Sequence, residues 1–361
     1  MNDIKFDIYI ITSILDFDIL NITIPYIKKN IPANQLYIVA KEPPSQKNLV
    51  DCKFLDENKI IEGLSYDSVA NTIVSLGGDK KNTGWYLQQF IKLGISKISD
   101  NPYYLVWDAD TIPLKPLDFF DSVGNPYFNL KREYNKAYFD TIKKLISLKK
   151  NKSESFISEH MMFNVAFVEE LIQNINNNYL LKGDSFWKKI LFASFSYTAS
   201  NERTFSEFET YGVFITKYHK NSYSFRKLNT LRRGTDFFGI NVSDDILNWC
   251  SNILDTISFE KYTACNHFIN IPDEIYRKNN TVLDFLSNEY KKDKKKLRKA
   301  LLLNKRDEYE IALKQALVYE SDFIFIRTPQ YFPCIDFIKK YKLLRFIFLS
   351  FKILTGSGQH L

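Results

Sequence analysis

Two aspartates, Asp108 and Asp110, stand one residue apart at the end of an apolar run, residues 103–107. Acids that follow a buried strand are costly to desolvate unless a positive charge meets them. In an extended chain, residues two apart point to the same side, and the small Ala109 between the acids leaves room for a ligand. Carboxylate oxygens suit Mg²⁺ or Mn²⁺, whose coordination is usually completed by water and substrate phosphates. We therefore predict a divalent-cation site here.

The chemistry that such a site serves is the departure of a diphosphate. A divalent cation bridging the two phosphates neutralises the charge that builds on the leaving group. The alternative is a pair of acids that cap a turn, and Pro113 and Pro116 do indicate a turn after them. The apolar strand before the acids favours the metal site.

The elements that position these acids read as alternating strands and helices. Residues 6–12 predict a strand, residues 16–29 an amphipathic helix and residues 35–40 a second strand, the opening of a βαβ unit. Thr12 and Ser13 follow the first strand. They either cap the next helix or face a nucleotide-sized crevice at the carboxyl end of a parallel sheet.

A second amphipathic helix is predicted at residues 83–97, directly before the strand that carries the acids, and a weaker strand is expected around residues 52–61. Gln88 and Gln89 either reach a bound donor or satisfy hydrogen bonds in the interior. Trp85 either contacts the donor or only packs.

Residues 107–120, WDADTIPLKPLDFF, resemble the Asp-x-Asp segment of GT-A glycosyltransferases. More narrowly, the chain resembles a bacterial group associated with capsule and lipopolysaccharide gene sets. The pattern of that group includes Gly-Trp-x-x-Gln-Gln, His-Met-Met-Phe and Ser-Glu-x-Glu-x-Tyr-Gly segments. These are matched here at residues 84–89, 160–163 and 206–212, and the resemblance covers roughly residues 6–240.

The resemblance implies an α/β fold of the GT-A type, Rossmann-like, with a mixed and mostly parallel sheet flanked by helices. It implies a nucleotide-sugar donor, with Asp110 on the metal and Asp108 on the metal or the ribose. The expected reaction moves a sugar from a nucleotide-diphosphate donor to a hydroxyl of a surface glycan. The acceptor would be a glycan or lipid-linked oligosaccharide of capsule or lipopolysaccharide.

Glu207, which lies 97 residues beyond Asp110, precedes an apolar run that reads as a strand. We expect an inverting transferase, which needs a carboxylate that takes the proton of the acceptor hydroxyl, and Glu207 is the predicted base. Glu209, on the same side by strand alternation, is the reserve. A retaining mechanism would need no base here. In the alternative interpretation, one of these acids pairs with an arginine: Arg203, Arg226 or Arg232.

Two histidines are further candidates. His160, beside Glu159, is predicted to orient the donor or acceptor sugar. His219 could complete the shell of the metal, because imidazole is an acceptable ligand of Mn²⁺. A lone histidine is more often structural, so both assignments await the fold.

Three other functions share some of these features. A haloacid-type phosphatase also begins with two acids after a strand, but it has Thr or Val where this chain has Ile112. A sugar nucleotidyltransferase would open with a glycine-rich phosphate loop, and no glycine precedes Gly63. A non-catalytic protein that binds nucleotide sugars or a membrane is the third alternative, which the presence of both aspartates argues against.

The charge of the chain is concentrated at its end. The formal net charge is +7, and residues 276–361 hold 18 Lys and Arg against 9 Asp and Glu. We predict a catalytic domain at residues 1–275 and a basic helical extension at residues 276–361. Residues 335–354 interleave lysines with apolar residues, so they could lie on an anionic membrane surface or pack on the enzyme. No nucleic-acid-binding motif accompanies the charge.

The four cysteines, Cys52, Cys250, Cys265 and Cys334, form neither a zinc spacing nor a disulfide framework. The first twelve residues lack the basic start and cleavage site of a signal peptide. A cytoplasmic protein, peripheral on the inner face of the cell membrane if the extension binds lipid, is therefore expected.

Overall fold

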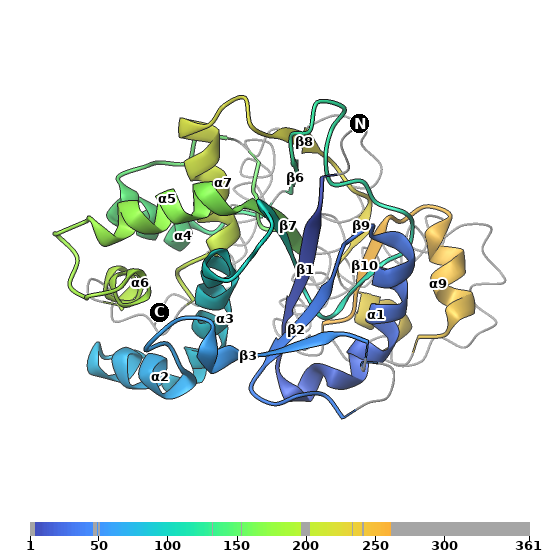
Figure 1. Cartoon of the computed structure of the whole chain (residues 1–361), viewed down its shortest axis with the longest axis horizontal. Helices are drawn as coiled ribbons and strands as arrows, with labels where there is room; N and C mark the ends of the chain where they lie inside the picture. Colours follow the sequence, from blue (N-terminus) through green and yellow to red (C-terminus); the bar gives the residue numbers. More distant parts are fainter. Residues whose placement is uncertain are drawn as a thin grey trace, which may run out of the picture.

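A five-stranded sheet lies at the centre of the protein in the computed structural model (Figure 1). Its strands are β1 (Phe6–Ile11), β2 (Leu36–Ala40), β3 (Lys53–Asp56), β4 (Tyr103–Trp107) and β7 (His160–Asn164). They lie in the order β3-β2-β1-β4-β7; the first four are parallel, and β7 is antiparallel to β4. The structure describes residues 4–260 except 46–48, 50, 132, 153, 196–202, 233, 240 and 241.

Every residue of β1 is buried, because helices cover both faces of the sheet. Alternate side chains point to opposite faces of a strand. Tyr9 and Ile11 therefore belong to the larger hydrophobic cluster, whereas Phe6, Ile8 and Ile10 belong to a second cluster with helix α1 (Phe17–Asn30). A continuous apolar run such as FDIYII is typical of a strand buried on both sides.

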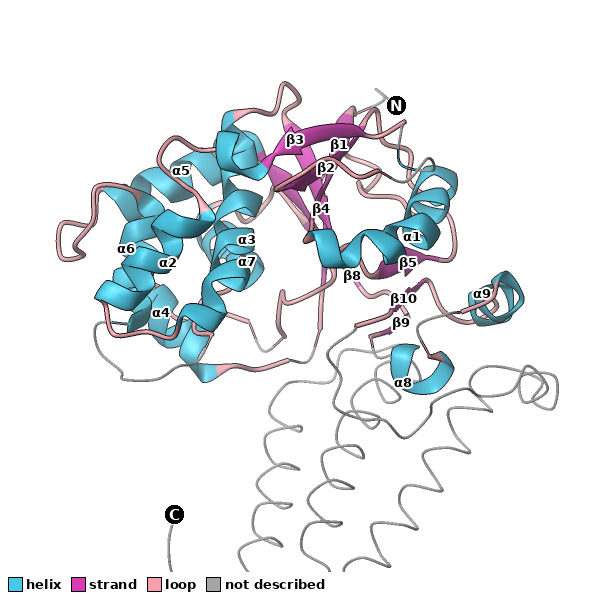
Figure 2. Cartoon of the chain, turned by 90° about the horizontal axis from the view of Figure 1, so that it is seen from below, coloured by secondary structure: helices cyan, strands magenta, loops and turns pink. Residues whose placement is uncertain are grey.

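Figures 1 and 2 show α1 on one side of the sheet and a larger group of helices on the other. These helices are α2 (Tyr66–Ser75), α3 (Thr83–Gly94), α4 (Lys136–Ile146), α5 (Val165–Asn176), α6 (Phe186–Phe195) and α7 (Glu207–Tyr218). None of the described helices combines the length and the hydrophobicity that crossing a bilayer requires.

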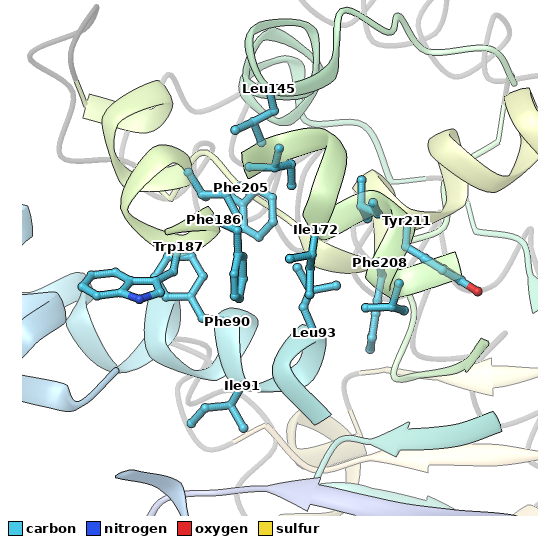
Figure 3. Packing of buried hydrophobic residues seen from close by; sticks show 14 of the residues in the cluster. Phe90, Ile91, Leu93, Leu145, Ile172, Phe186, Trp187, Phe205, Phe208 and Tyr211 are labelled. Carbon is cyan, nitrogen blue, oxygen red and sulfur yellow. The ribbon is translucent and has the colours of Figure 1, made fainter. Parts of the chain in front are cut away.

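The core between the sheet and this helical group is rich in aromatic side chains (Figure 3). The ring of Phe90 on α3 lies 6.2 Å from that of Trp187 and 6.3 Å from that of Phe205, measured between centroids. All three side chains are buried. This packing fixes α3 against the core, and with it the positions of Gln88 and Lys92 on the same helix.

Two small sheets extend the fold beyond β4. One has the order β5-β10-β9, formed by β5 (Thr111–Pro113), β10 (Thr256–Ser258) and β9 (Thr230–Leu231). The other pairs β6 (Tyr127–Asn129) with β8 (Ser224–Arg226). Helices α8 (Gly234–Phe238) and α9 (Asp244–Ser251) lie near the first of these sheets (Figure 2). Since β5 begins directly after Asp110, this sheet holds the far side of the Asp108–Asp110 turn.

The predicted α/β class, with a mostly parallel sheet between helices, is confirmed. The strands and helices expected within residues 6–61 and 83–107 are present, with ends shifted by a few residues. Four features of the sequence analysis lie outside the described residues: the predicted basic extension, the predicted boundary at residue 275, Cys265 and Cys334. Cys52 and Cys250 are both free thiols.

The strand predicted after Glu207 is wrong. Residues 207–218 form helix α7, for which Ser206 is the N-cap, its side chain accepting a hydrogen bond from the backbone N–H of Glu209 at 3.2 Å. Residues two apart on a helix point in different directions, so Glu207 and Glu209 do not share a side as strand alternation would require. Later in the same segment, the Tyr211 hydroxyl accepts a hydrogen bond from the backbone N–H of Asn164 at 2.9 Å.

Candidate active site at the carboxyl edge of the sheet

The chain enters the sheet at β1, adds β2 and β3 on one side, and then returns to place β4 on the other side of β1. In open α/β sheets, ligands bind outside the carboxyl ends of the strands at such a switch point. Thr12 and Ser13 follow β1, whereas Asp108 and Asp110 follow β4. The structure therefore brings these predicted site residues to one edge of the sheet.

The two aspartates lie in a tight turn between β4 and β5, not in the strand itself. The backbone N–H of Thr111 donates to the carbonyl of Asp108 at 3.2 Å, and the N–H of Asp108 donates to the carbonyl of Glu159 at 2.9 Å. The hydroxyl of Thr23 on α1 donates to the carbonyl of Ala109 at 2.9 Å. Hydrogen bonds from three directions thus hold the backbone that carries the acids.

Lys92 on α3 is the positive charge that meets Asp108, and the sequence analysis missed it. Its Nζ lies 2.9 Å from Oδ1 of Asp108 and 2.9 Å from Oε1 of Glu207, and 4.4 Å from the centre of the Phe208 ring. The side chains of Lys92 and Glu207 are only 5% and 2% exposed. The one signal in the sequence was a lysine amid the apolar residues of α3.

The electrostatics of this ion pair follow from burial. Burial acts to lower the pKa of Lys92, but the charges of Asp108 and Glu207 outweigh it and leave that pKa above its ordinary value. Burial also raises the pKa of Glu207, and the neighbouring Lys92 opposes that rise. The three charges therefore depend on one another, and a buried pair of this kind is strongly destabilised when one partner is removed.

The protein stabilises the charged form of Asp110 less than that of Asp108. Burial raises its pKa to about 7, the charges of Asp108 and Glu260 add to the rise, and Arg232 partly offsets it. Its Oδ1 accepts a hydrogen bond from the Thr111 hydroxyl at 3.3 Å. A carboxylate whose charged form is disfavoured in the protein alone is stabilised by a cation bound beside it.

The raised pKa predicts a pH-dependent response to cations. Folding raises the pKa of Asp110 from 3.8 to about 7, so the folded state favours the protonated carboxyl. This preference stabilises the folded protein at low pH, and the stabilisation is lost as the pH rises through 7. In chelator at pH 8, Asp110→Asn should therefore be more stable than the wild type, by on the order of 4 kcal/mol. Adding Mn²⁺ should stabilise the wild type at pH 8 more than at pH 5.5, and urea denaturation at both pH values measures this.

The residues present fit a hard divalent cation bound jointly with a substrate. Asp108 and Asp110 supply oxygen ligands, and Oδ2 of Asp108 is the oxygen that does not bond to Lys92. Within the described part of the chain, no group of three or more His, Cys, Asp or Glu side chains could hold a metal. Mg²⁺ and Mn²⁺ sites that act on phosphates commonly use one or two carboxylates and leave the remaining positions to water and the substrate.

Contacts around the end of β1 agree with the capping alternative for its polar residues. The Ser13 hydroxyl accepts from the N–H of Leu15 at 3.0 Å, and that of Thr12 donates to the carbonyl of Ser13 at 3.3 Å. Gln88 Nε2 donates to the carbonyl of Ile11 at 3.0 Å, whereas Gln89 is buried. Gln88 thus ties α3 to the carboxyl end of β1.

Glu209 lies apart from Lys92 and is fully buried. Its Oε2 accepts hydrogen bonds from the Ser155 hydroxyl at 2.8 Å and from the N–H of Phe156 at 2.9 Å, and its Oε1 lies 3.4 Å from Nζ of Lys150. These contacts join α7 to the segment before β7. The alternative interpretation had one of these acids pair with Arg203, Arg226 or Arg232, but the ion-pair partner of each acid among the described residues is a lysine.

His160 is an interior residue of the sheet. It opposes Trp107 in the β4–β7 register, and the two rings stack with centroids 4.4 Å apart. Its Nε2 lies 3.3 Å from a guanidinium nitrogen of Arg226 and also contacts the amide nitrogen of Asn129. Both neighbours are donors, so Nε2 accepts, and burial lowers the pKa of His160 well below its ordinary value. A neutral histidine here supports the strand that precedes Asp108.

His219 is placed at the far end of α7 from Glu207. A helix of twelve residues is about 18 Å long. His219 stacks on Phe167 with ring centroids 3.9 Å apart, and its Nε2 lies 2.9 Å from Oε2 of Glu170. The structure therefore does not bring His219 to the aspartates.

Comparison with known proteins gives a family and several structural likenesses. No curated protein matches the chain. Among solved structures, the chain is similar to the galactosyltransferase LgtC in complex with donor and acceptor sugar analogs (9% identity, 76% of this chain and 100% of that chain, TM-score 0.37). It is also similar to mouse xyloside xylosyltransferase 1 in its apo form (12% identity, 74% and 100% covered, TM-score 0.38). The model of one protein family, described as a family of unknown function (DUF6492), matches residues 34–261. This match spans more than half of the chain, and the protein belongs to the DUF6492 family.

Proposed function

We propose that this protein is a metal-dependent glycosyltransferase that moves a sugar from a nucleotide-diphosphate donor to a hydroxyl of a glycan acceptor. The observation that carries the proposal is the placement of Asp108 and Asp110 at the carboxyl end of β4, at the switch point of the sheet. The resemblance of the residues around these acids to the Asp-x-Asp segment of GT-A glycosyltransferases supports the same proposal.

In this proposal, Asp110 and the free oxygen of Asp108 bind Mn²⁺ or Mg²⁺. The cation, when bound, stabilises the charge of the diphosphate that leaves as the bond to the sugar breaks. Lys92 holds Oδ1 of Asp108, so that the orientation of this carboxylate is set before the donor arrives. Such preorganisation reduces the cost of ordering the site at the moment of reaction.

The role of Glu207 changes from the one that the sequence suggested. A general base must lie within hydrogen-bond reach of the hydroxyl that it deprotonates. Glu207 is 2% exposed and bonds to Lys92, so we propose that it positions Lys92 and, through Lys92, Asp108. The proposal then names no base, and both an inverting and a retaining mechanism are compatible with it.

The acceptor and the location of the enzyme rest on the sequence resemblance. We propose a hydroxyl of a capsule or lipopolysaccharide glycan, reached from the cytoplasmic face of the membrane. The part of the chain expected to bind an anionic membrane surface, residues 276–361, lies outside the described residues, so that role stays a prediction.

A thermal-shift screen of nucleotide sugars, each with Mn²⁺ and with chelator, tests the proposed function. A ligand that binds only the folded protein raises its unfolding temperature. At least one nucleotide-diphosphate sugar should stabilise the wild type in Mn²⁺ and not in chelator. Asp51→Asn is the matched control, because Asp51 is 87% exposed and its one ion pair with a described residue is to Lys28 on the surface. Stabilisation by no nucleotide sugar, or equal stabilisation in chelator, would contradict the proposal.

A further inference from the structure

Three residues of α3 line up on one side of the helix at spacings of three and four. They are Trp85, Gln88 and Lys92. Lys92 contacts Asp108, and Gln88 contacts the end of β1. Trp85 is about 10 Å from Lys92 along the helix axis, since each residue rises 1.5 Å. A donor sugar and one acceptor ring can span this length, so Trp85 lies within substrate reach of the proposed metal site.

Trp85 is half of an aromatic pair that remains partly exposed. Its ring and that of Tyr138 on α4 are nearly parallel, with an interplanar angle of 17° and centroids 6.4 Å apart. Neither side chain is buried as fully as the core aromatics. Burial raises the pKa of the Tyr138 hydroxyl, the charge of Glu207 adds to this rise, and the charge of Arg203 opposes it.

Arg203 lies over the same tryptophan. The carbon at the centre of its guanidinium is 5.7 Å from the centre of the Trp85 ring. Arg203 is exposed, and across the residues that the structure describes no carboxylate is within ion-pair distance of it. A guanidinium held over an aromatic ring keeps its planar set of donors available for a carboxylate or a phosphate.

These features combine two kinds of recognition. Aromatic side chains offer an apolar face to a ring, and the few polar groups beside them determine which ligand is accepted. Arg203 has no carboxylate partner among the described residues, and it lies beside two partly exposed aromatic rings. This arrangement fits a sugar that carries a negative charge. Surface packing of Arg203 on Trp85 is the competing explanation, and it predicts no effect on binding.

We infer that Trp85, Tyr138 and Arg203 form the acceptor subsite of this enzyme, and that the acceptor is a saccharide carrying an anionic group. The inference rests on the proposed function. The aromatic pair binds the sugar ring, and Arg203 binds its carboxylate or phosphate. Charge-assisted hydrogen bonds of this kind change affinity by about 10-fold or more.

Saturation-transfer NMR and calorimetric titration with three probes test the inference. The probes are methyl glucuronide, glucose 6-phosphate and the neutral methyl glucoside, each at millimolar concentration. Wild-type protein should bind at least one anionic probe about 10-fold more tightly than the neutral one. Preference for the glucuronide alone would identify a carboxylate acceptor, and preference for the phosphate alone a phosphorylated one.

The variants separate the subsite from the donor site. Arg203→Gln should lose the anionic preference to within about 2-fold, and Trp85→Leu should weaken all three probes. Lys220→Gln removes an exposed charge elsewhere and should leave the binding of all three probes unchanged.

Circular dichroism establishes that the variants are folded. Mn²⁺-dependent nucleotide binding should be unchanged in Arg203→Gln. If the wild type does not bind the nucleotide in Mn²⁺, the proposed function is refuted, whatever the three saccharide probes show.

Two results would overturn the inference while leaving the proposed function in place. One is the absence of any anionic preference in the wild type, or its survival in Arg203→Gln. The other is a loss of Mn²⁺-dependent nucleotide binding in Arg203→Gln, which would place Arg203 on the donor.

Discussion

Replacing Lys92 with methionine is expected to lower the free energy of unfolding at pH 8 by about 3–5 kcal/mol, because it leaves the buried carboxylate of Glu207 and the partly exposed one of Asp108 without their cation. Lys92 bonds to Asp108 and Glu207 at 2.9 Å each, and methionine retains most of its apolar length. The loss should be smaller at pH 5.5. Burial already raises the pKa of Glu207, and removing Lys92 raises it further, so that Glu207 takes up a proton as the pH falls. Urea denaturation at the two pH values measures the effect.

A second buried lysine provides the matched control. Lys189 on α6 donates to the carbonyls of Asn176 and Asn178 at 2.6 and 2.8 Å, and it makes no ion pair with a described residue. Lys189→Met should also destabilise the protein, but by an amount that does not change between pH 5.5 and pH 8. In a double-mutant cycle, Glu207→Gln should recover part of the loss in Lys92→Met. A loss below about 1 kcal/mol in Lys92→Met, or one independent of pH, would contradict the account of the ion pair.

Replacing Asp110 with asparagine is expected to weaken the Mn²⁺-dependent binding of a nucleotide-diphosphate sugar by about 100-fold or more, the equivalent of about 2.7 kcal/mol. Asparagine retains an oxygen that can accept from the Thr111 hydroxyl, so the turn should keep its shape. What is lost is the anionic oxygen that a hard cation prefers. Calorimetric titration of the donor in Mn²⁺ and in chelator measures the change.

The reference for Asp110→Asn is the wild type in chelator. Both should bind the donor weakly and to a similar extent, because both lack the bridging cation. Asp51→Asn should behave as the wild type in Mn²⁺, since a surface ion pair contributes little. Donor binding that is unchanged in Asp110→Asn would show that the cation, if used, is held elsewhere.

Local patterns were sufficient to predict the elements that carry the aspartates. The apolar run of β1, the amphipathic pattern of α3 and the strand before Asp108 each follow from neighbouring residues alone. The placement of Thr12 and Ser13 at the same sheet edge as the aspartates also follows, because parallel strands of a βαβ fold have their carboxyl ends on one side.

Helix α7 shows where local patterns were insufficient. Its residues FETYGVFITKY include many aromatic and β-branched types, which favour strands when they are considered alone. Packing of nearly all these side chains in the core determines the helix instead. The signal that could have corrected the prediction was the Ser-x-x-Glu sequence at Ser206 and Glu209, which marks a helix start.

The contact between Lys92 and Glu207 could not be predicted from spacing. These residues are far apart in the sequence, and they meet only because α3 and α7 pack side by side in the same helical group. Fixed sequence spacing gives neighbours within one helix or one strand. It gives no information about which helix a lysine will face.

Diffraction from a crystal soaked with Mn²⁺ and a nucleoside diphosphate, recorded at the manganese absorption edge, tests the central claim most directly. The account predicts one anomalous peak within coordination distance, about 2.1–2.3 Å, of a carboxylate oxygen of Asp110, with Asp108 and phosphate oxygens completing the shell. A bound nucleotide with no manganese at these carboxylates, or manganese bound only at other residues, would contradict it.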